Sequence, residues 1–120
     1  MLKQTLKAFS VIILAVIFVS SVSYAATVSG SGRQSRGYPG HNAEISGQLF
    51  TLPATGTISN IDSQGASGFW IEKESGEMVR NFDTIGESAG YSLPAGRYRV
   101  IPNIKDGFNT CWVNVTFTYP

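Results

Sequence analysis

The stretch Cys111-Trp112-Val113-Asn114-Val115-Thr116-Phe117-Thr118-Tyr119 alternates between two kinds of residue. Its odd positions carry Cys, Val, Val, Phe and Tyr, and its even positions carry Trp, Asn, Thr and Thr. Because successive side chains of a strand point to opposite faces, this period predicts a strand with its odd residues in a core. Cys111 is then expected to be buried and inert, as a small apolar side chain. A reactive or intermolecular thiol is the open alternative.

A second alternating run precedes this strand and is predicted to pair with it. In Arg97-Tyr98-Arg99-Val100-Ile101 the residues of core character stand at even positions, which leaves the arginines and Ile101 outside. A loop over residues 102–110 then gives a hairpin in which residue 99 pairs with residue 114 and Ile101 meets Trp112. The core faces of both strands coincide in this register, and a slip by one residue would separate them.

A further hairpin is predicted upstream, from Phe69–Lys73 and Met78–Phe82. A Ser-Gly pair between the two runs suits a tight turn with a positive φ at Gly76. Pairing residue 73 with residue 78 places Phe69 opposite Phe82, a favourable cross-strand contact. The same register brings Glu74 toward Glu77, so a longer loop is left open.

The remaining apolar runs are short and are separated by glycines. Strands are expected within Glu44–Leu52, Gly56–Ile61 and Gly90–Leu93. No run has the spacing of an amphipathic helix, so no substantial helix is expected after the N-terminal segment. The sequence therefore predicts an all-β, jelly-roll-like antiparallel β-sandwich of about six to eight strands over residues 43–120.

The N-terminal segment, residues 1–25, has the features of a signal peptide. Lys3 and Lys7 precede the apolar run Val11–Val19, and Ser23-Tyr24-Ala25 offers small residues at the cleavage positions. The run is too short to span a bilayer, which takes about 20 residues. We expect a bacterial protein that is secreted or periplasmic and has no stable membrane anchor after cleavage. An uncleaved N-terminal anchor is the alternative.

Residues 26–42 (ATVSGSGRQSRGYPGHN) are rich in Gly and Ser and nearly free of apolar side chains. Such a segment cannot bury enough surface to offset the entropy of ordering it. The sequence therefore predicts a flexible leader here.

Composition narrows the classes of function. The 120 residues hold 9 Lys and Arg against 8 Asp and Glu, which argues against nucleic acid as a partner. One Cys and one His cannot make a zinc site or an intramolecular disulfide. His41 lies in the expected leader without a fixed partner, so neither catalysis nor a cofactor is predicted. Asp62, Asp83 and Asp106 leave calcium open as an alternative, but they lack the spacing of a calcium loop.

The run Tyr91-Ser92-Leu93-Pro94-Ala95-Gly96-Arg97-Tyr98-Arg99-Val100 resembles a segment of bacterial pre-peptidase C-terminal domains that reads leucine, small residue, Gly, x, Tyr, x, Val. The hairpin before it is also similar to the one those domains place there, and the resemblance covers residues 47–118. It implies a jelly-roll-like sandwich, found on secreted enzymes, that has no catalysis of its own. The family's Asp-rich strand motif is missing here, so calcium binding does not carry over.

The ending Val113–Pro120, with its penultimate Tyr, is similar to the last strand of chaperone–usher pilins. Those subunits complete one another's sandwich by strand addition. This resemblance implies the alternative of a pilus- or fimbria-like assembly subunit that joins through edge strands. Residues 26–36, however, offer little apolar content beyond Val28 for a donor strand.

These patterns together predict a secreted, non-catalytic binding module whose partner is a carbohydrate or a cell-surface or secreted protein. An exposed indole beside guanidinium and amide groups on a sheet can stack on a sugar or on a protein. Trp70 has the opposite parity to Phe69 and Ile71, so it too is expected outside. The predicted contact residues are Arg97, Arg99, Ile101, Trp112, Asn114 and Trp70.

Overall fold

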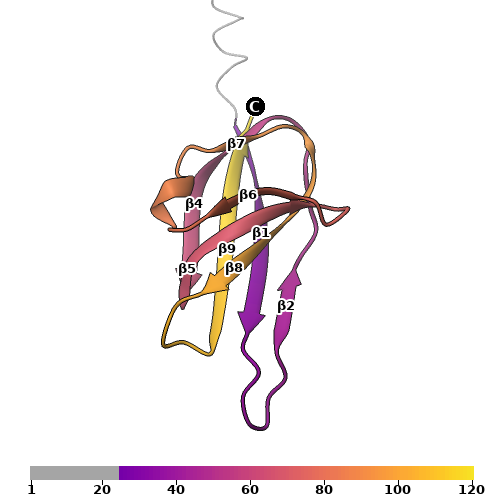
Figure 1. Ribbon diagram of the computed structural model, residues 1–120. Helices are drawn as coiled ribbons and strands as arrows, with labels where there is room; N and C mark the ends of the chain where they lie inside the picture. Colours follow the sequence, from indigo (N-terminus) through magenta and orange to yellow (C-terminus); the bar gives the residue numbers. More distant parts are fainter. Residues whose placement is uncertain (1–24) are drawn as a thin grey trace, which may run out of the picture.

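Residues 25–120 are described by the computed structural model, and they form two antiparallel sheets packed face to face (Figure 1). The five-stranded sheet contains, in spatial order, β2 (Glu44–Gly47), β1 (Ala26–Ser35), β9 (Thr110–Tyr119), β4 (Gly56–Gln64) and β7 (Ser92–Leu93). The four-stranded sheet contains β3 (Phe50–Leu52), β8 (Gly96–Ile104), β5 (Ala66–Lys73) and β6 (Met78–Phe82). The predicted all-β antiparallel sandwich is confirmed, with nine strands in the described residues.

Helical structure within residues 25–120 is limited to one short 3-10 turn, η1 (Gly86–Ser88). No helix in this part of the chain has the length and hydropathy needed to cross a membrane. The predicted signal peptide over residues 1–25 lies, but for its last residue, outside the described part of the chain, so it stays a prediction.

Strand β9 lies at the centre of the five-stranded sheet, and its alternation is as predicted. Cys111, Val113, Val115 and Phe117 are buried, whereas Trp112 is exposed. The inward residues of both sheets form one cluster of apolar side chains. Its buried members are Phe50, Leu52, Ile58, Phe69, Ile71, Phe82, Leu93, Tyr98, Val100, Val113, Val115 and Phe117.

The prediction of a flexible leader over residues 26–42 is wrong for its first ten residues. They form β1, which pairs with β9 from Ala26↔Tyr119 to Ser35↔Thr110 without a break in register. The segment reads as a linker because its inward positions at the centre of the strand are Gly30 and Gly32, both buried. Only residues 36–43 form a connection, so the sandwich begins at β1 instead of residue 43.

The glycines of β1 allow an unusually close approach of the two sheets. A Cβ atom at Gly30 would stand 2.5 Å from Cε1 of Phe50, and one at Gly32 would overlap the carbonyl oxygen of Val100. Gly47 of β2 meets the same carbonyl, at 2.9 Å from a Cβ in its place. Backbone therefore packs here against the opposite sheet where a side chain would otherwise lie.

The predicted hairpin of residues 97–101 with residues 111–119 is also wrong, because β8 and β9 belong to different sheets. β9 has β1 along one edge and β4 along the other, so neither edge is free for β8. β8 runs on through Pro102 to Ile104 and pairs with β3 and β5. Tyr98 and Val100 still face the core, as predicted, and they belong to the same buried cluster as the inward residues of β9.

The predicted β5–β6 hairpin is confirmed. Phe69 pairs with Phe82, and the centroids of their rings lie 5.1 Å apart. The predicted pairing of residue 73 with residue 78 is wrong: a bulge after Ile71 shifts the register, so Met78 pairs with Glu72, and the Lys73 N–H donates to the Glu77 carbonyl oxygen. Gly76 takes the expected positive φ of 90°. The two glutamates of the turn lie apart, because Glu74 pairs with Arg97 and Glu77 pairs with Lys73.

The expected strand over Glu44–Leu52 is divided between the two sheets. β2 pairs with β1, and β3 pairs with β8, so the chain changes sheet at Gln48 and Leu49. The first residue of β1 and the last residue of β9 meet at one end of the sandwich (Figure 1).

Substitution of Gly32 tests the close approach of the sheets. We expect Gly32→Ala to lower the free energy of unfolding by about 3 kcal/mol or to prevent folding, because its methyl group must displace backbone of β8. Denaturant unfolding followed by circular dichroism measures the change. Gly86→Ala, at a glycine with open space around it and no positive φ, is the matched control and should change stability by less than about 0.5 kcal/mol. Equal stability of the two variants would contradict the packing described here.

Candidate functional site

The six predicted contact residues do not form one surface, because β8 and β9 lie in different sheets. Arg97, Arg99, Ile101 and Trp70 belong to the four-stranded sheet, and Trp112 and Asn114 belong to the five-stranded sheet. The two indoles therefore lie on different sheets, and the accessibility of each to a ligand depends on its own neighbours.

Trp70 takes the place beside Ile101 that the sequence assigned to Trp112. The two residues pair in the β5–β8 ladder. Ile101 is only 5% exposed, so the prediction that it faces solvent is wrong; its Cγ1 lies 3.1 Å from where a Cβ of Gly47 would stand. The indole nitrogen of Trp70 donates to Oε2 of Glu72 at 3.2 Å, and the side chain is half-buried. This face is therefore covered in part by the chain itself.

Arg97 and Arg99 are both engaged by Glu74. Nη1 of Arg97 lies 2.9 Å from the Glu74 carboxylate, and Nη1 of Arg99 donates to the Glu74 carbonyl oxygen at 3.1 Å. These contacts tie the β5–β6 turn to β8. Exposed pairs of this kind contribute little to stability, and here each guanidinium that the sequence offered to a ligand directs one N–H group at Glu74.

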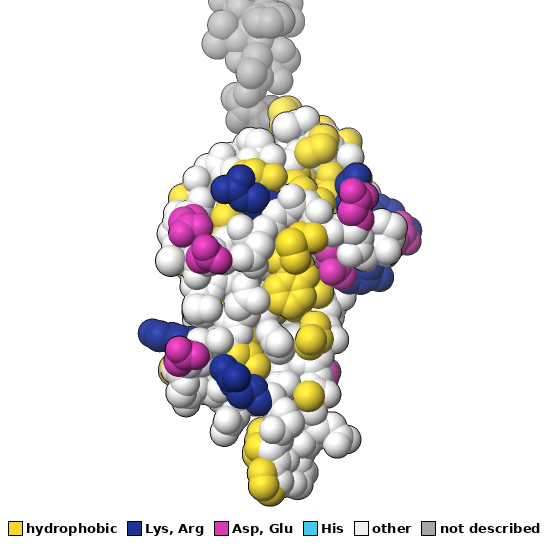
Figure 2. Space-filling view, in the orientation of Figure 1, with side chains coloured by type: hydrophobic (Ala, Val, Ile, Leu, Met, Phe, Trp, Pro, Cys, Tyr) yellow, Lys and Arg dark blue, Asp and Glu magenta, His cyan; other side chains and the backbone are white. Residues whose placement is uncertain are grey.

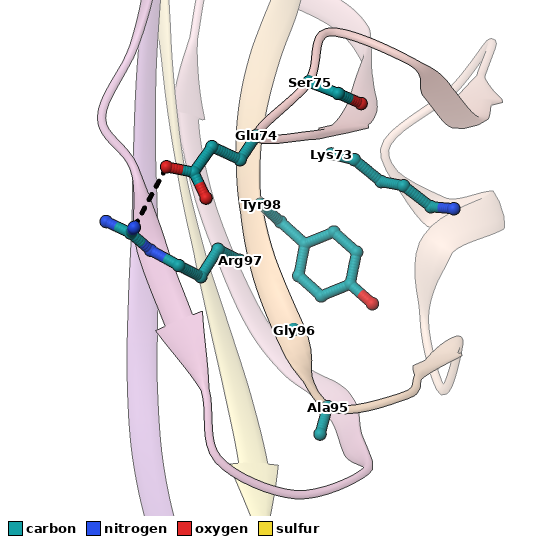
Figure 3. A pocket seen from close by; sticks show the side chains of 7 residues that line it. All are labelled: Lys73, Glu74, Ser75, Ala95, Gly96, Arg97 and Tyr98. Atoms are coloured by element: carbon teal, nitrogen blue, oxygen red, sulfur yellow. Dashed lines mark hydrogen bonds and ion pairs between the residues drawn. The ribbon is translucent and has the colours of Figure 1, made fainter.

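An open hollow adjoins this ion pair (Figure 3). The Tyr98 hydroxyl at its side donates to the Pro94 carbonyl oxygen at 2.8 Å, and burial raises the pKa of this phenol. The charged groups in the hollow are already paired with one another or with Glu77. Its lining residues are Lys73, Glu74, Ser75, Ala95, Gly96, Arg97 and Tyr98.

Trp112 lies in a different setting, at one end of β9. It is 41% exposed, and its cross-strand neighbours are Arg33 on β1 and Gln64 on β4. The indole nitrogen donates to Oε1 of Gln64 at 3.3 Å, which fixes the direction of the ring. The indole is thus oriented and accessible on the outer face of the five-stranded sheet.

The next row along β9 places amide, hydroxyl and carboxylate groups side by side. Asn114 lies between Ser31 of β1 and Asp62 of β4. Ser31 donates its hydroxyl proton to Oδ1 of Asn114 at 3.1 Å, so the carbonyl side of the amide is held. Both hydrogens on Nδ2 then point away from that bond and remain available to a ligand.

Further along β9 the outer face carries only neutral polar groups. A hydrogen bond of 3.0 Å joins the hydroxyls of Ser29 and Thr116, and Thr118 donates to the Ser59 hydroxyl at 2.8 Å. We call the outward residues of β1, β9 and β4 the platform. Its members are Thr27, Ser29, Ser31 and Arg33 of β1, Trp112, Asn114, Thr116 and Thr118 of β9, and Thr57, Asn60, Asp62 and Gln64 of β4.

The sequence alone did not indicate the two strands that flank β9 on the platform, β1 and β4. Arg33 and Ser31 were assigned to the leader, and nothing local in the sequence places β4 next to β9. One signal could have found β1, namely the alternation of Gly30 and Gly32 with Ser29, Ser31 and Arg33. Small residues at every second position are as regular as apolar ones, although they bury backbone instead of side chains.

The histidine and the aspartates that the sequence offered for catalysis or metal binding lie apart from one another. His41 stacks on Tyr38 with ring centroids 4.2 Å apart, in the connection after β1. Asp62, Asp83 and Asp106 lie in separate parts of the fold. Within residues 25–120, no group of three or more His, Cys, Asp or Glu side chains could hold a metal ion.

Comparison with protein-family models, with curated proteins and with solved structures finds no significant match to this chain. The resemblances to pre-peptidase C-terminal domains and to pilins therefore remain predictions.

Tryptophan fluorescence distinguishes the two indoles. The variant Trp70→Phe keeps only Trp112, and Trp112→Phe keeps only Trp70. We expect acrylamide to quench the emission of Trp70→Phe more steeply, because Trp112 is exposed and Trp70 is half-buried against Glu72. The Stern–Volmer slopes of the two folded variants give the comparison, with both denatured variants as the reference. Equal slopes in the folded state would place Trp112 under cover and remove it from the site.

Cys111 gives a test of burial and pH dependence. Burial raises the pKa of its thiol, so the folded protein keeps the proton at pH values where the unfolded chain loses it. We expect stability to fall as the pH rises above about 8.5, the ordinary thiol value, and Cys111→Ala to lack this part of the pH dependence. Because the thiolate is the reactive form, a thiol reagent should label the folded protein slowly and the denatured protein at once. Rapid labelling of the folded chain would contradict the burial.

Proposed function

We propose that this protein is a secreted, non-catalytic module that binds carbohydrate on the platform. The observation that carries the proposal is Trp112, exposed on an open sheet face and oriented by Gln64, with Arg33 on its other side. An indole packs against the C–H groups of a sugar ring, and planar amide, guanidinium and carboxylate groups hydrogen-bond its hydroxyls. The platform places both kinds of group side by side.

The surroundings of Trp112 favour a sugar over a protein partner. Binding hot spots in protein interfaces sit in well-packed centres from which neighbouring contacts exclude water. The cross-strand neighbours of Trp112 are polar, and the next residues along the platform are Ser, Asn and Thr. Figure 2 shows the opposite face, on the side of β5 and β6, where exposed hydrophobic side chains gather at the centre of the view instead. Isolated aromatic surface among hydroxyl and amide groups suits a ligand that is itself polar at its edges.

Binding to a panel of insoluble and soluble polysaccharides tests the proposal. We expect Trp112→Ala to weaken binding at least about tenfold, since truncation of an aromatic anchor commonly costs more than 1–2 kcal/mol. Isothermal titration calorimetry gives the affinity, and circular dichroism confirms that the variant folds. Trp70→Ala, at the other indole, is the matched control and should bind as the wild type does. Loss of binding in the control alone would move the site to the four-stranded sheet, and the absence of any binding would refute the proposal.

Assembly through edge strands is the second candidate. β7 covers β4 only at Gly56 and Thr57, so the far part of β4 has no second partner strand within residues 25–120. A groove runs beside it, lined by Ile58, Ser59, Asn60, Ile61, Ile85, Gly86 and Ala89. A strand added there would extend the sheet by β-augmentation. Size-exclusion chromatography of the mature protein distinguishes the two: a monomer that binds glycan argues against assembly, and a ladder of oligomers supports it.

A further inference from the structure

We infer that the ligand of the platform is the interior of an unbranched, uncharged polysaccharide chain that lies along β9. This inference rests on the proposed function and specifies the substrate class of the same site. Three features of the platform carry it: its open shape, its balance of charge and its length along the strand.

The platform is an open face, whereas a site for a chain end would enclose it. β1 pairs with β9 over the whole length of both strands, and β4 pairs with it from Thr57 to Gln64 with one bulge. Neither Trp112 nor Asn114 lines the hollows around Tyr98, beside Ile45 and beside Ile58, and Asn60 is the one platform residue that borders any of the three. Around Trp112 and Asn114 the platform is therefore an open face, and a ligand there can extend along β9.

The charges of the platform cancel. Arg33 and Asp62 are its two charged members, and they flank adjacent positions of β9, Trp112 and Asn114. The remaining members, apart from the indole, are Ser, Thr, Asn and Gln. An anionic or cationic polymer would meet no net opposite charge here, whereas a neutral chain of hydroxyl groups finds donors and acceptors in every row.

The long direction of the platform follows β9. Outward residues of a strand repeat about every 6.7 Å, so Trp112 to Thr118 spans about 20 Å, enough for several consecutive sugar rings. Polar residues flank the outward residues of β9 on both sides. Arg33 and Gln64 are the cross-strand neighbours of Trp112, and Ser29 and Asn60 are those of Thr116. Across the strands, the line through Trp112 runs from Ser46 of β2 to Gln64 of β4 and ends there, because β7 pairs with β4 only at Gly56 and Thr57. With strands about 4.8 Å apart, these four strands span about 14 Å, which is less than the length along β9. A chain laid along β9 therefore touches the most platform residues.

The rows of the platform make two kinds of variant available. Trp112 anchors one end, so Trp112→Ala should weaken oligosaccharides of every length. Thr116 is the second outward residue of β9 after Trp112, about 13 Å along the strand, so Thr116→Ala should weaken only the binding of oligosaccharides long enough to reach it. Thr51→Ala, an exposed threonine on β3 in the opposite sheet, is the matched control for the second variant.

Calorimetric titration with linear cello-, chito- and malto-oligosaccharides of one to six units, and with oligogalacturonates as anionic probes, tests the inference. We expect the affinity for one neutral series to rise at least tenfold from the monosaccharide to about the tetrasaccharide and then to level off. Thr116→Ala should lower the affinity for the tetrasaccharide about threefold or more and leave the disaccharide unchanged. Added salt should not weaken binding, because no counter-ions are displaced.

The outcomes separate this inference from the proposed function. A monosaccharide that binds as tightly as the hexasaccharide, or oligogalacturonates that bind better than every neutral series, would overturn the inference and leave carbohydrate binding intact. Wild-type affinity of Thr116→Ala for the long probes would also overturn it. If no sugar of either kind binds, the proposed function itself fails.

Discussion

The close packing of β1 against the opposite sheet is the constraint on which the rest of the structure depends. Gly30 and Gly32 bring the backbone of β1 onto Phe50 and the Val100 carbonyl, where side chains would force the sheets apart. With β1 in this position, β9 has a partner along each edge. The platform needs that arrangement, because β1 is one of the three strands that form it. A strand that buries almost no side chain of its own thus creates the surface on which a ligand can lie.

The same constraint determines the neighbours of β8. Since both edges of β9 are occupied, the chain after Ile104 crosses to the other sheet, and β8 pairs with β5 instead. Trp70 then lies beside Ile101, and Arg97 and Arg99 meet Glu74 of the β5–β6 turn. The guanidinium groups that the sequence placed around Trp112 therefore lie on the other sheet. Arg33, from a segment that looks like a linker, stands beside the indole in their place.

The features that could be predicted are those set by neighbours in the sequence. The two-residue period of β9 determines which of its side chains are buried, and the Ser-Gly pair between two short apolar runs indicates the β5–β6 hairpin. The choice of strand partners is different, because it depends on contacts between segments far apart in the chain. Two alternating runs joined by a short loop fit a hairpin and a crossing between sheets equally well, since both place Val100 and Val113 in the core. The β9 residues of the candidate site, a third of the platform, followed from the period, and the residues on β1 and β4 required the topology.

Hydrogen bonds across the strands prepare the platform for binding. Ser31 holds Asn114, Ser29 joins Thr116, and Gln64 holds the indole of Trp112. Side chains that are already fixed lose less conformational entropy when a ligand arrives, so more of the contact energy appears as affinity. Hydroxyl and amide groups held in this way still keep free donors and lone pairs, because each has more than one hydrogen-bonding position. A polar face of this kind remains soluble while empty and needs no large movement to bind, which suits a small sandwich that has no disulfide within its described residues.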